Sequence, residues 1–520
     1  MIVLYLGTFI TSLVVSFILT REVRDFATTR AWVSPPHSDL PSRPLPRLGG
    51  VAIFLSFLLS CSLALAIARH LPGPGSEFAF KSIIAILAPA SLVFLLGVYD
   101  DLHQVGPYTK FAVQGLAAIM LFAGGLRILQ MPILFGSHHF PWFVGLPLTV
   151  IWVLAITNAF NLIDGLDGLA AGSALFSTLV VFVVSLATQS VLVSLLALAL
   201  VGAIAGFLRF NFSPATIFLG DCGSLFIGFV LSALALRGAT KSPTIIAVAI
   251  PVVSFGLPIL ETTLSILRRW ISGRPVFVGD REHIHHKLLQ QGRSHRQVVI
   301  ILYAVSAVFG LLSLFLLWPV SQMLGLVLAV VGVGVWIGVQ RLGYLEFGEL
   351  RRVAQKTIGR QLLINNLAIR RATQELKVSN DYAQICRVLV AAFGGNEFDA
   401  FDLLLQSPVY EGTAFRALQL ISAWDEPPRL RWINPGSYYR SGTVSAWSLN
   451  LELLTSRNQR RGNMIIYLLQ TNRDLQVDLN LLTCIFPVAL ADALERAMLA
   501  EVAQFSQVAR NPGILAAHAS

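Results

Sequence analysis

The stretch Asn158-Ala-Phe-Asn-Leu-Ile-Asp-Gly-Leu-Asp-Gly-Leu-Ala170 follows an apolar run and carries four polar side chains at a regular spacing of three residues. This polar row consists of Asn158, Asn161, Asp164 and Asp167. Neighbours three residues apart lie side by side on a helix, so adjacent members of the row can share a ligand. We expect Gly165 and Gly168 to break the helix so that more members face one point. Carboxylates at the rim of a membrane helix favour a functional site, with a capped helix end as the alternative.

The composition is that of a membrane protein. Of 520 residues, 55% are hydrophobic and 13% are charged, and the mean hydropathy is +0.70. The net charge of +10 does not indicate a nucleic-acid partner, because no basic stripe with interleaved aromatic residues is present. We therefore expect a multi-span α-helical membrane protein.

The apolar runs predict about eleven transmembrane helices, since a span takes roughly 20 apolar residues. The runs are Met1–Thr20, Gly49–Arg69, Lys81–Tyr99, Lys110–Gln130, Phe143–Phe160, Gly168–Ala187, Ser190–Phe210, Cys222–Arg237, Thr244–Leu267, Val298–Trp318 and Gln322–Gln340. The first run is interpreted as a retained span, because its charges follow it and no small-residue cleavage site ends it.

The basic residues predict the orientation. Most loop lysines and arginines fall on one side, and the other side holds only Arg69, Lys81, Arg127, Arg237 and Lys241. The basic side faces the cytoplasm. We expect a multi-pass protein of the inner (cytoplasmic) membrane with its N-terminus outside. Every polar stretch that contains candidate catalytic or binding residues lies on the cytoplasmic side.

Two of these stretches add carboxylates. Asp100 and Asp101 end the third span and suit a general base or a divalent metal, with a solvated helix end as the alternative. Asp221, at the start of a later helix, either caps that helix or presents its carboxylate to Mg²⁺. Phe218, three residues earlier, can stack on a ring.

The stretch Arg274–Lys287 adds a basic loop with His283, His285 and His286. Three histidines can bind zinc, but the basic surroundings favour a phosphate-like anion. Carboxylates for Mg²⁺, a basic loop for phosphates and a membrane scaffold together indicate phosphoryl transfer to a lipid, which depends on charge neutralisation and positioning.

The motifs, in order along the chain, resemble those of the polyprenyl-phosphate N-acetylhexosamine-1-phosphate transferases (glycosyltransferase 4, WecA-MraY type). They are Pro46-Arg-Leu-Gly-Gly50, Asp100-Asp101, the polar row, Phe218-Leu-Gly-Asp221 and His283-Ile-His-His286. Residues 1–340 carry the resemblance, and the chain looks WecA-like because Ile284 interrupts the histidines. The phospho-MurNAc-pentapeptide transferases, which tend to carry three consecutive histidines, are the alternative.

The resemblance implies transfer of GlcNAc-1-phosphate from UDP-GlcNAc to undecaprenyl phosphate, with release of UMP and with Mg²⁺ or Mn²⁺ as cofactor. It implies catalytic and metal-binding roles for Asp100, Asp101 and Asp221, with Asp221 as the Mg²⁺ ligand and Asp100 as the base. It implies substrate binding by Asn158, Asn161, Asp164, Asp167, Asn211, Phe218, Arg281, His283, His285 and His286. The family often carries Lys and His residues just before its first motif. Here that stretch is His37-Ser-Asp-Leu-Pro-Ser-Arg-Pro44, and Arg43 is expected to substitute.

Two mechanisms fit these residues: direct attack by the lipid phosphate, and double displacement through an aspartyl-phosphate on Asp221. Direct attack is favoured because a metal-bound carboxylate is a poor nucleophile. From other classes, a transporter or an inactive membrane anchor is the alternative. Carboxylates at span ends and the absence of an internal repeat weigh against a transporter, and four intact motifs weigh against an anchor.

Beyond the membrane region the sequence predicts a helical connector (341–380), a cytoplasmic α/β domain (381–509) and a disordered tail (510–520). The domain is expected to contain a helix Asp381–Phe393, strands Asp399–Leu405, Trp447–Leu454 and Met464–Gln470, and a last helix Val477–Met498. This order weakly resembles a GAF-type sensory module. Such a module would imply regulation or a homodimer, with a stabilising appendage as the alternative.

Overall fold

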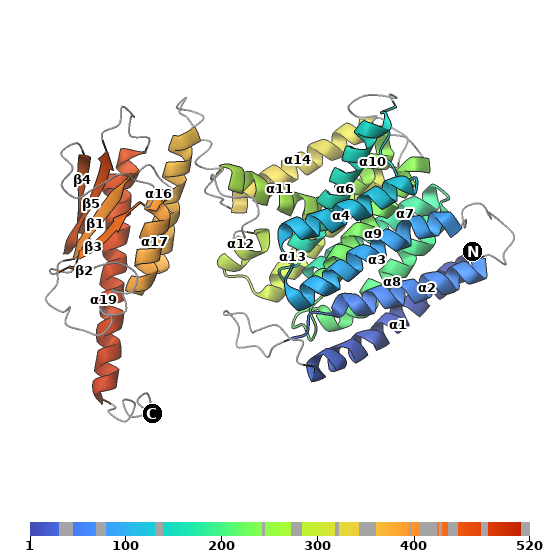
Figure 1. The fold of residues 1–520 in the computed structure, drawn as a ribbon, viewed down its shortest axis with the longest axis horizontal. Helices are drawn as coiled ribbons and strands as arrows, with labels where there is room; N and C mark the ends of the chain where they lie inside the picture. The colour runs from blue at the N-terminus through green and yellow to red at the C-terminus, as the bar shows by residue number, and fades with distance from the viewer. Residues whose placement is uncertain are drawn as a thin grey trace. The chain divides into compact units, whose positions relative to one another are not determined.

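The computed structural model (Figure 1) describes residues 1–30, 45–68, 80–130, 139–241, 245–271, 283–317, 322–342, 360–394, 398–405, 424–425, 429–434, 446–469 and 477–510. The chain divides into two compact units. The membrane unit comprises Met1–Ile266 and Phe277–Leu342, and the C-terminal unit comprises Leu267–Val276 and Gly343–Ser520.

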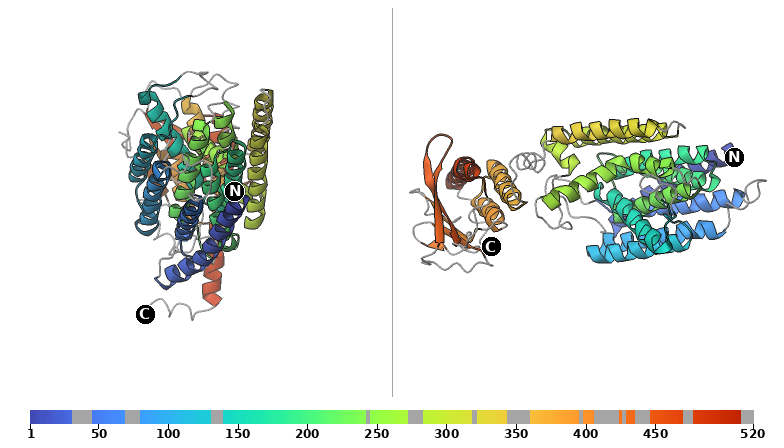
Figure 2. Two further views of the ribbon diagram at one scale, coloured as in Figure 1. Left: turned by 90° about the vertical axis from the view of Figure 1, so that its right-hand side faces the viewer. Right: turned by 90° about the horizontal axis from the view of Figure 1, so that it is seen from above.

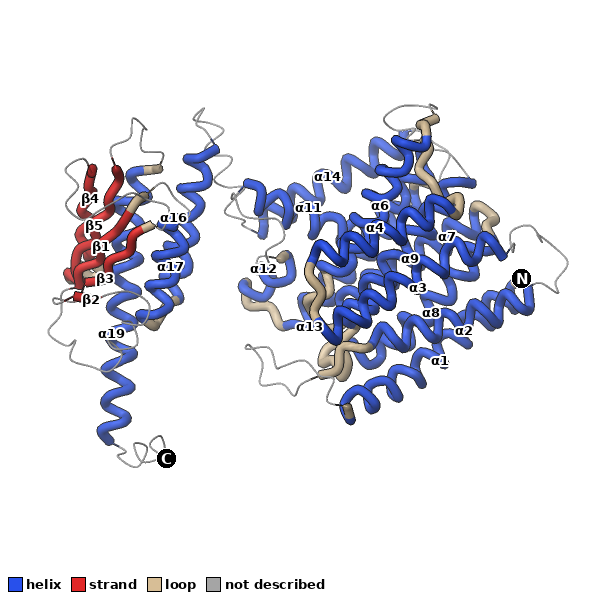
Figure 3. The backbone as a smooth tube through the Cα atoms, viewed as in Figure 1, coloured by secondary structure: helices blue, strands red, loops and turns tan. Residues whose placement is uncertain are grey.

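The membrane unit is a helical bundle, drawn as blue tubes in Figure 3. Its helices are α1 (Ile2–Thr29), α2 (Gly49–Ala68), α3 (Phe80–His103), α4 (Pro107–Ala123), α6 (Trp142–Leu162), α7 (Leu169–Ala187), α8 (Val191–Asn211), α9 (Gly220–Lys241), α10 (Ile245–Ser254), α11 (Gly256–Ile271), α12 (Ile284–Gln290), α13 (His295–Phe315) and α14 (Gln322–Leu342). Within the described ranges, nine helices are long and apolar enough to cross a bilayer. The predicted multi-span helical class is confirmed.

Two of the predicted spans take a different form in the structure. The run Lys110–Gln130 corresponds to α4, which has 17 residues and ends at Ala123. The run Thr244–Leu267 is divided into α10 and α11 at Phe255. Gly256 follows the break and lies against the Phe309 ring, which leaves no room for a Cβ atom there. Apolar composition revealed these runs but not the break between the helices.

Helices α2 and α3 approach the first turn of α9 so closely that their backbones are in contact. A Cβ atom on Gly97 of α3 would lie 2.4 Å from Cys222 Cα, and one on Gly50 of α2 would lie 2.2 Å from Gly223 N. Only glycine permits such an approach. The close packing therefore fixes the turn of α9 that carries Asp221 against the end of α3 that carries Asp100 and Asp101.

The C-terminal unit is an antiparallel sheet with helices on one face (Figure 2, right). Its strand order is β2-β3-β1-β5-β4. The elements are α16 (Arg360–Val378), α17 (Tyr382–Gly394), β1 (Ala400–Leu405), β2 (Trp424–Asp425), β3 (Arg429–Ile433), β4 (Ala446–Leu454), β5 (Arg460–Leu469), the π-helix η1 (Leu481–Ile485) and α19 (Phe486–Arg510). Strands β2 and β3 were not predicted, and most of the predicted tail lies outside the described residues.

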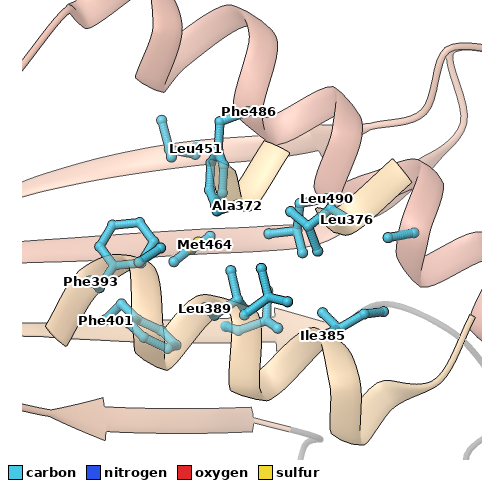
Figure 4. Close-up of a cluster of buried hydrophobic side chains, with 14 of the residues drawn as sticks. Ala372, Leu376, Ile385, Leu389, Phe393, Phe401, Leu451, Met464, Phe486 and Leu490 are labelled. Carbon is cyan, nitrogen blue, oxygen red and sulfur yellow. The ribbon is translucent and has the colours of Figure 1, made fainter. Parts of the chain in front are cut away.

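The core of this unit shows that α16 is more than a connector. Phe393 and Leu389 of α17, Met464 of β5 and Phe486 of α19 pack together in the cluster of Figure 4. Helix α16 adds Ile369, Ala372 and Leu376, all of which are buried in the same cluster. Its apolar positions three to four residues apart form a stripe that the charged composition of the segment concealed.

Candidate active site

A short pairing of two loops sets the position of Asp221. The Phe218 amide donates to the Pro46 carbonyl (2.9 Å), and the Gly49 and Gly50 amides donate back to Phe218 (3.0 Å) and Leu219 (2.9 Å). Gly220 then takes a positive φ of +76°, and a Cβ atom there would lie 1.9 Å from the Arg47 carbonyl oxygen. A glycine is therefore required immediately before Asp221. The first and fourth sequence motifs thus form one structural element.

Asp101 caps helix α9 across the helix interface. Its Oδ1 accepts from the Asp221 amide (2.8 Å) and its Oδ2 accepts from the Cys222 amide (3.0 Å). These amides belong to the first turn of α9, where backbone donors have no intrahelical partner. The cap predicted as the alternative role of Asp221 is therefore supplied by Asp101, and the carboxylate of Asp221 is not needed for capping.

Asp100 and Asp221 form an acidic pair around one ammonium group. Lys110 Nζ, at the start of α4, lies 2.5 Å from Asp100 Oδ2 and 2.5 Å from Asp221 Oδ2. Asn161, from the polar row, donates from Nδ2 to Asp221 Oδ1 (3.0 Å). Four helices, α3, α4, α6 and α9, thus supply one polar centre. Sequence analysis gave Lys110 no role in the site: it counted among the basic residues of the cytoplasmic side, at the start of the run Lys110–Gln130. The missed signal was a lysine one turn into the helix that follows the Asp100-Asp101 motif.

Three predicted substrate-binding residues hold the local backbone or a neighbouring helix. Asn158 donates to Gln114 Oε1 of α4 (2.7 Å), one turn beyond Lys110. Asp167 accepts from the Ala215 amide (3.0 Å), and Asn211 donates to the Ile217 carbonyl (2.9 Å). These bonds fix α4 and the loop before Phe218. Their predicted contacts with substrate stay predictions.

Asp164 lies between the spans in a strongly acidic environment. Its surroundings raise the pKa of Asp164 well above the ordinary value, first through loss of hydration and then through the charges of Asp221 and Asp101. Arg47 opposes this shift. Asp164 of the polar row therefore interacts electrostatically with Asp221 of the acidic pair.

The histidines of the motif His283-Ile-His-His286 gather at the start of α12. The rings of His283 and His285 lie parallel with centroids 5.5 Å apart, and His286 lies 4.4 Å from His285. A Cβ atom on Gly165 would lie 2.7 Å from His285 Nε2, so His285 rests on the broken segment of the polar row. Burial, and then the charges of His286, His283 and His295, lower the pKa of His285 to about 3. His285 is therefore neutral near pH 7.

Glu261 of α11 is a second residue that sequence analysis missed. It is 2% exposed, and its Oε1 lies 2.7 Å from His283 Nδ1. A carboxylate within the apolar run Thr244–Leu267 was the available signal. Two predicted residues, Arg43 and Arg281, lie outside the described residues.

The arrangement suits a hard divalent cation. Mg²⁺ prefers oxygen ligands and is typically held by one or two carboxylates together with substrate phosphates. The acidic pair offers two carboxylates that converge on one cation, as the position of Lys110 Nζ shows. No group of three or more His, Cys, Asp or Glu side chains suited to a metal occurs among the described residues. A metal at this place would therefore need phosphate or water to complete its ligands.

Comparisons with known proteins show what this chain is similar to. The model of glycosyl transferase family 4 matches residues 83–239. A probable undecaprenyl-phosphate N-acetylglucosaminyl 1-phosphate transferase of Bacillus subtilis is 37% identical over 311 residues, 59% of this chain and 84% of the relative. A decaprenyl-phosphate N-acetylglucosaminephosphotransferase of Mycobacterium tuberculosis is 33% identical over 322 residues (56% and 78%). A phospho-N-acetylmuramoyl-pentapeptide-transferase of Halalkalibacterium halodurans is 31% identical over 294 residues (54% and 86%).

Proposed function

Because this chain belongs to glycosyl transferase family 4, we propose that it transfers N-acetylglucosamine-1-phosphate to a polyprenyl phosphate within the membrane. The donor is a UDP-sugar, UDP-GlcNAc in the first instance, and the second product is UMP. The observation that carries the proposal is that the carboxylates of Asp100 and Asp221 converge on the Lys110 ammonium, at 2.5 Å each. The reaction is the first membrane step of a cell-envelope polysaccharide pathway.

The roles of the acidic pair follow from its contacts. Asp221 is held by Asn161 and Lys110 through separate oxygens and would bind Mg²⁺. When bound, Mg²⁺ supplies neutralisation of the charge on the donor pyrophosphate. Asp100, which also accepts from the Val105 amide (2.5 Å), orients or deprotonates the lipid phosphate. Lys110 neutralises charge beside both groups.

We favour direct attack of the lipid phosphate on the β-phosphate of the donor. Both oxygens of Asp221 are already occupied by donors, which lowers the nucleophilicity of its carboxylate. The new P–O bond forms as the bond to the UMP oxygen breaks, so no covalent enzyme intermediate is needed. A labelled aspartyl-phosphate on Asp221, trapped without lipid, would contradict this mechanism.

His285 and its neighbours form the pyrophosphate side of the site. The buried His285 Nδ1 has no partner among the described residues, and an unpaired buried polar atom costs free energy. A bound phosphate oxygen would provide that partner once Nδ1 carries the proton. Phe218 would stack on the uracil ring. The active site and the C-terminal unit face the cytoplasm in this proposal.

The test is an assay of the purified protein in detergent with undecaprenyl phosphate and a panel of UDP-sugars. We expect UMP release with UDP-GlcNAc, dependent on Mg²⁺ and lipid, and a lipid product whose mass includes HexNAc and two phosphates. The matched control for substitutions in the acidic pair is Asp25→Asn, because Asp25 is an exposed carboxylate that pairs with Arg24. UMP release only with UDP-MurNAc-pentapeptide would establish the alternative donor. Release without lipid would contradict the proposal.

A further inference from the structure

Glu261 forms a buried connection between α11 and the histidine motif. Its carboxylate oxygens lie 3.0 and 3.1 Å from the Ile284 amide, and Oε1 is also 2.7 Å from His283 Nδ1. Ser265, one turn further along α11, approaches the same nitrogen at 3.4 Å. Glu261 therefore satisfies the first free backbone donor of α12 and one ring nitrogen of the residue that precedes this helix.

This connection determines the tautomer and the ring orientation of His283. Donation from Nδ1 to Glu261 places the proton of a neutral His283 on Nδ1 and leaves Nε2 as an acceptor. His283 is 9% exposed, and its ring lies parallel to that of His285. Both the tautomer and the ring plane of His283 are thus set by Glu261.

The connection also determines the position of His285. Helix α12 has only seven residues and little stability of its own. His285 is its second residue and packs on Gly165, whose neighbour Asp164 interacts with Asp221 and Asp101. Fixing the start of α12 therefore fixes the distance from His285 to the acidic pair.

We propose that Glu261 is a positioning residue that holds His283 and the start of α12, so that His285 faces the donor pyrophosphate. This inference rests on the proposed function for the identity of the ligand. Glu261 itself does not contact substrate. A small displacement of a positioned group lowers catalysis by about 10- to 100-fold.

Three substitutions separate position from charge. Glu261→Gln keeps a carbonyl oxygen that accepts from both His283 Nδ1 and the Ile284 amide, but it removes the charge. Glu261→Asp keeps the charge and shortens the side chain by one methylene. Glu261→Leu removes every acceptor. We expect kinetics close to wild type for Gln, and a KM for the UDP-sugar raised about tenfold for Asp and more for Leu, with the KM for polyprenyl phosphate unchanged.

A double-mutant cycle tests the route through His283. If Glu261 acts through this ring and α12, then Glu261→Leu raises the KM for the UDP-sugar less in the His283→Ala background than in wild type. The control for general loss of stability is Ser177→Ala, because the Ser177 hydroxyl donates to the Ser254 carbonyl (3.1 Å), a buried bond between α7 and α10 that does not involve α12. This variant is expected to keep both KM values. Equal increases of both KM values in Glu261→Leu, or a larger defect in Gln than in Asp, would overturn the proposal.

Hydrogen–deuterium exchange gives a readout that does not depend on the reaction. The peptide covering residues 283–291 is expected to exchange faster in Glu261→Leu and Glu261→Asp than in wild type or Glu261→Gln. If wild type shows no transfer but this pattern holds, the proposed function fails and the positioning role stands. If transfer is observed but exchange is the same in all variants, the positioning role fails alone.

Discussion

Each unit of the molecule buries carboxylates, but the two units neutralise them differently. In the C-terminal unit, Asp402 is 1% exposed and accepts from Arg431 through both oxygens (2.8 and 3.1 Å) and from the Tyr467 hydroxyl (3.1 Å). This carboxylate forms an ion pair with one arginine of the described residues. In the membrane unit, Asp100 and Asp221 share a single lysine, with Asp101 and Asp164 near them.

The difference distinguishes a structural ion pair from a functional site. In the Asp402–Arg431 pair, one guanidinium donates to both carboxylate oxygens, which is the arrangement of a structural ion pair. The acidic pair leaves negative charge in excess of its partner, and a bound cation or a proton on one of the carboxylates would relieve this excess. The same residue type therefore has opposite consequences in the two units, and substitutions can measure them.

The largest effect is expected from Asp221→Asn. We expect UMP release to fall at least about 1000-fold, equivalent to about 4 kcal/mol of transition-state stabilisation. The unfolding temperature should stay the same or rise, because repulsion with Asp100 is relieved. The measurement is single-turnover UMP release together with thermal unfolding in detergent. A variant with full activity would remove Asp221 from the metal site.

Lys110→Met should have the next largest effect. We expect about 100-fold slower UMP release, because the acidic pair and the phosphates lose their fixed positive charge. Without Mg²⁺ the variant should unfold at a lower temperature than wild type, and added Mg²⁺ should recover more stability in the variant. Thermal unfolding over a Mg²⁺ titration checks this. An identical response in both proteins would show that Lys110 and the metal do not share the acidic pair.

Asp402→Ala should reverse the pattern seen for Asp221. We expect a loss of about 2 kcal/mol in the stability of the C-terminal unit, discounted from the cost of breaking a fully buried pair because the Arg431 side chain is 31% exposed. UMP release should be unchanged. Pulse proteolysis in urea and the transferase assay measure the two quantities. Reduced transfer with unchanged stability would mean that both units contribute to the reaction.

The smallest effect concerns pH and His285. Its pKa is about 3 in the folded protein and about 6.5 when unfolded, so the unfolded chain binds more protons between these values. Stability should therefore fall as the pH falls below about 6.5, by about 1 kcal/mol at pH 5.5. His285→Gln should lose this component while other histidines contribute equally to both proteins. Parallel pH–stability curves would contradict the burial of a neutral His285.

The sequence allowed prediction of whatever depended on composition or local order. Long apolar runs predicted the spans, and their polar ends predicted Asp100, Asp221 and Asn161, which the structure brings together. Lys110 was missed because a basic residue at a helix start resembles any cytoplasmic loop charge. The role of Asp101 as a cap for α9 depends on residues 120 positions away in the chain, and no local pattern reveals it. Strand β3 was missed because its arginines pair with a strand distant in sequence.

The glycine contacts of α9 with α2 and α3 have a consequence for how this protein can diversify. Where backbones touch at Gly50 and Gly97, no side chain can act as a spacer, so the separation of the two carboxylates is a property of the main chain. Changes of sugar preference should therefore accumulate in the connections between helices, while the distance across the acidic pair stays constant from one variant to the next.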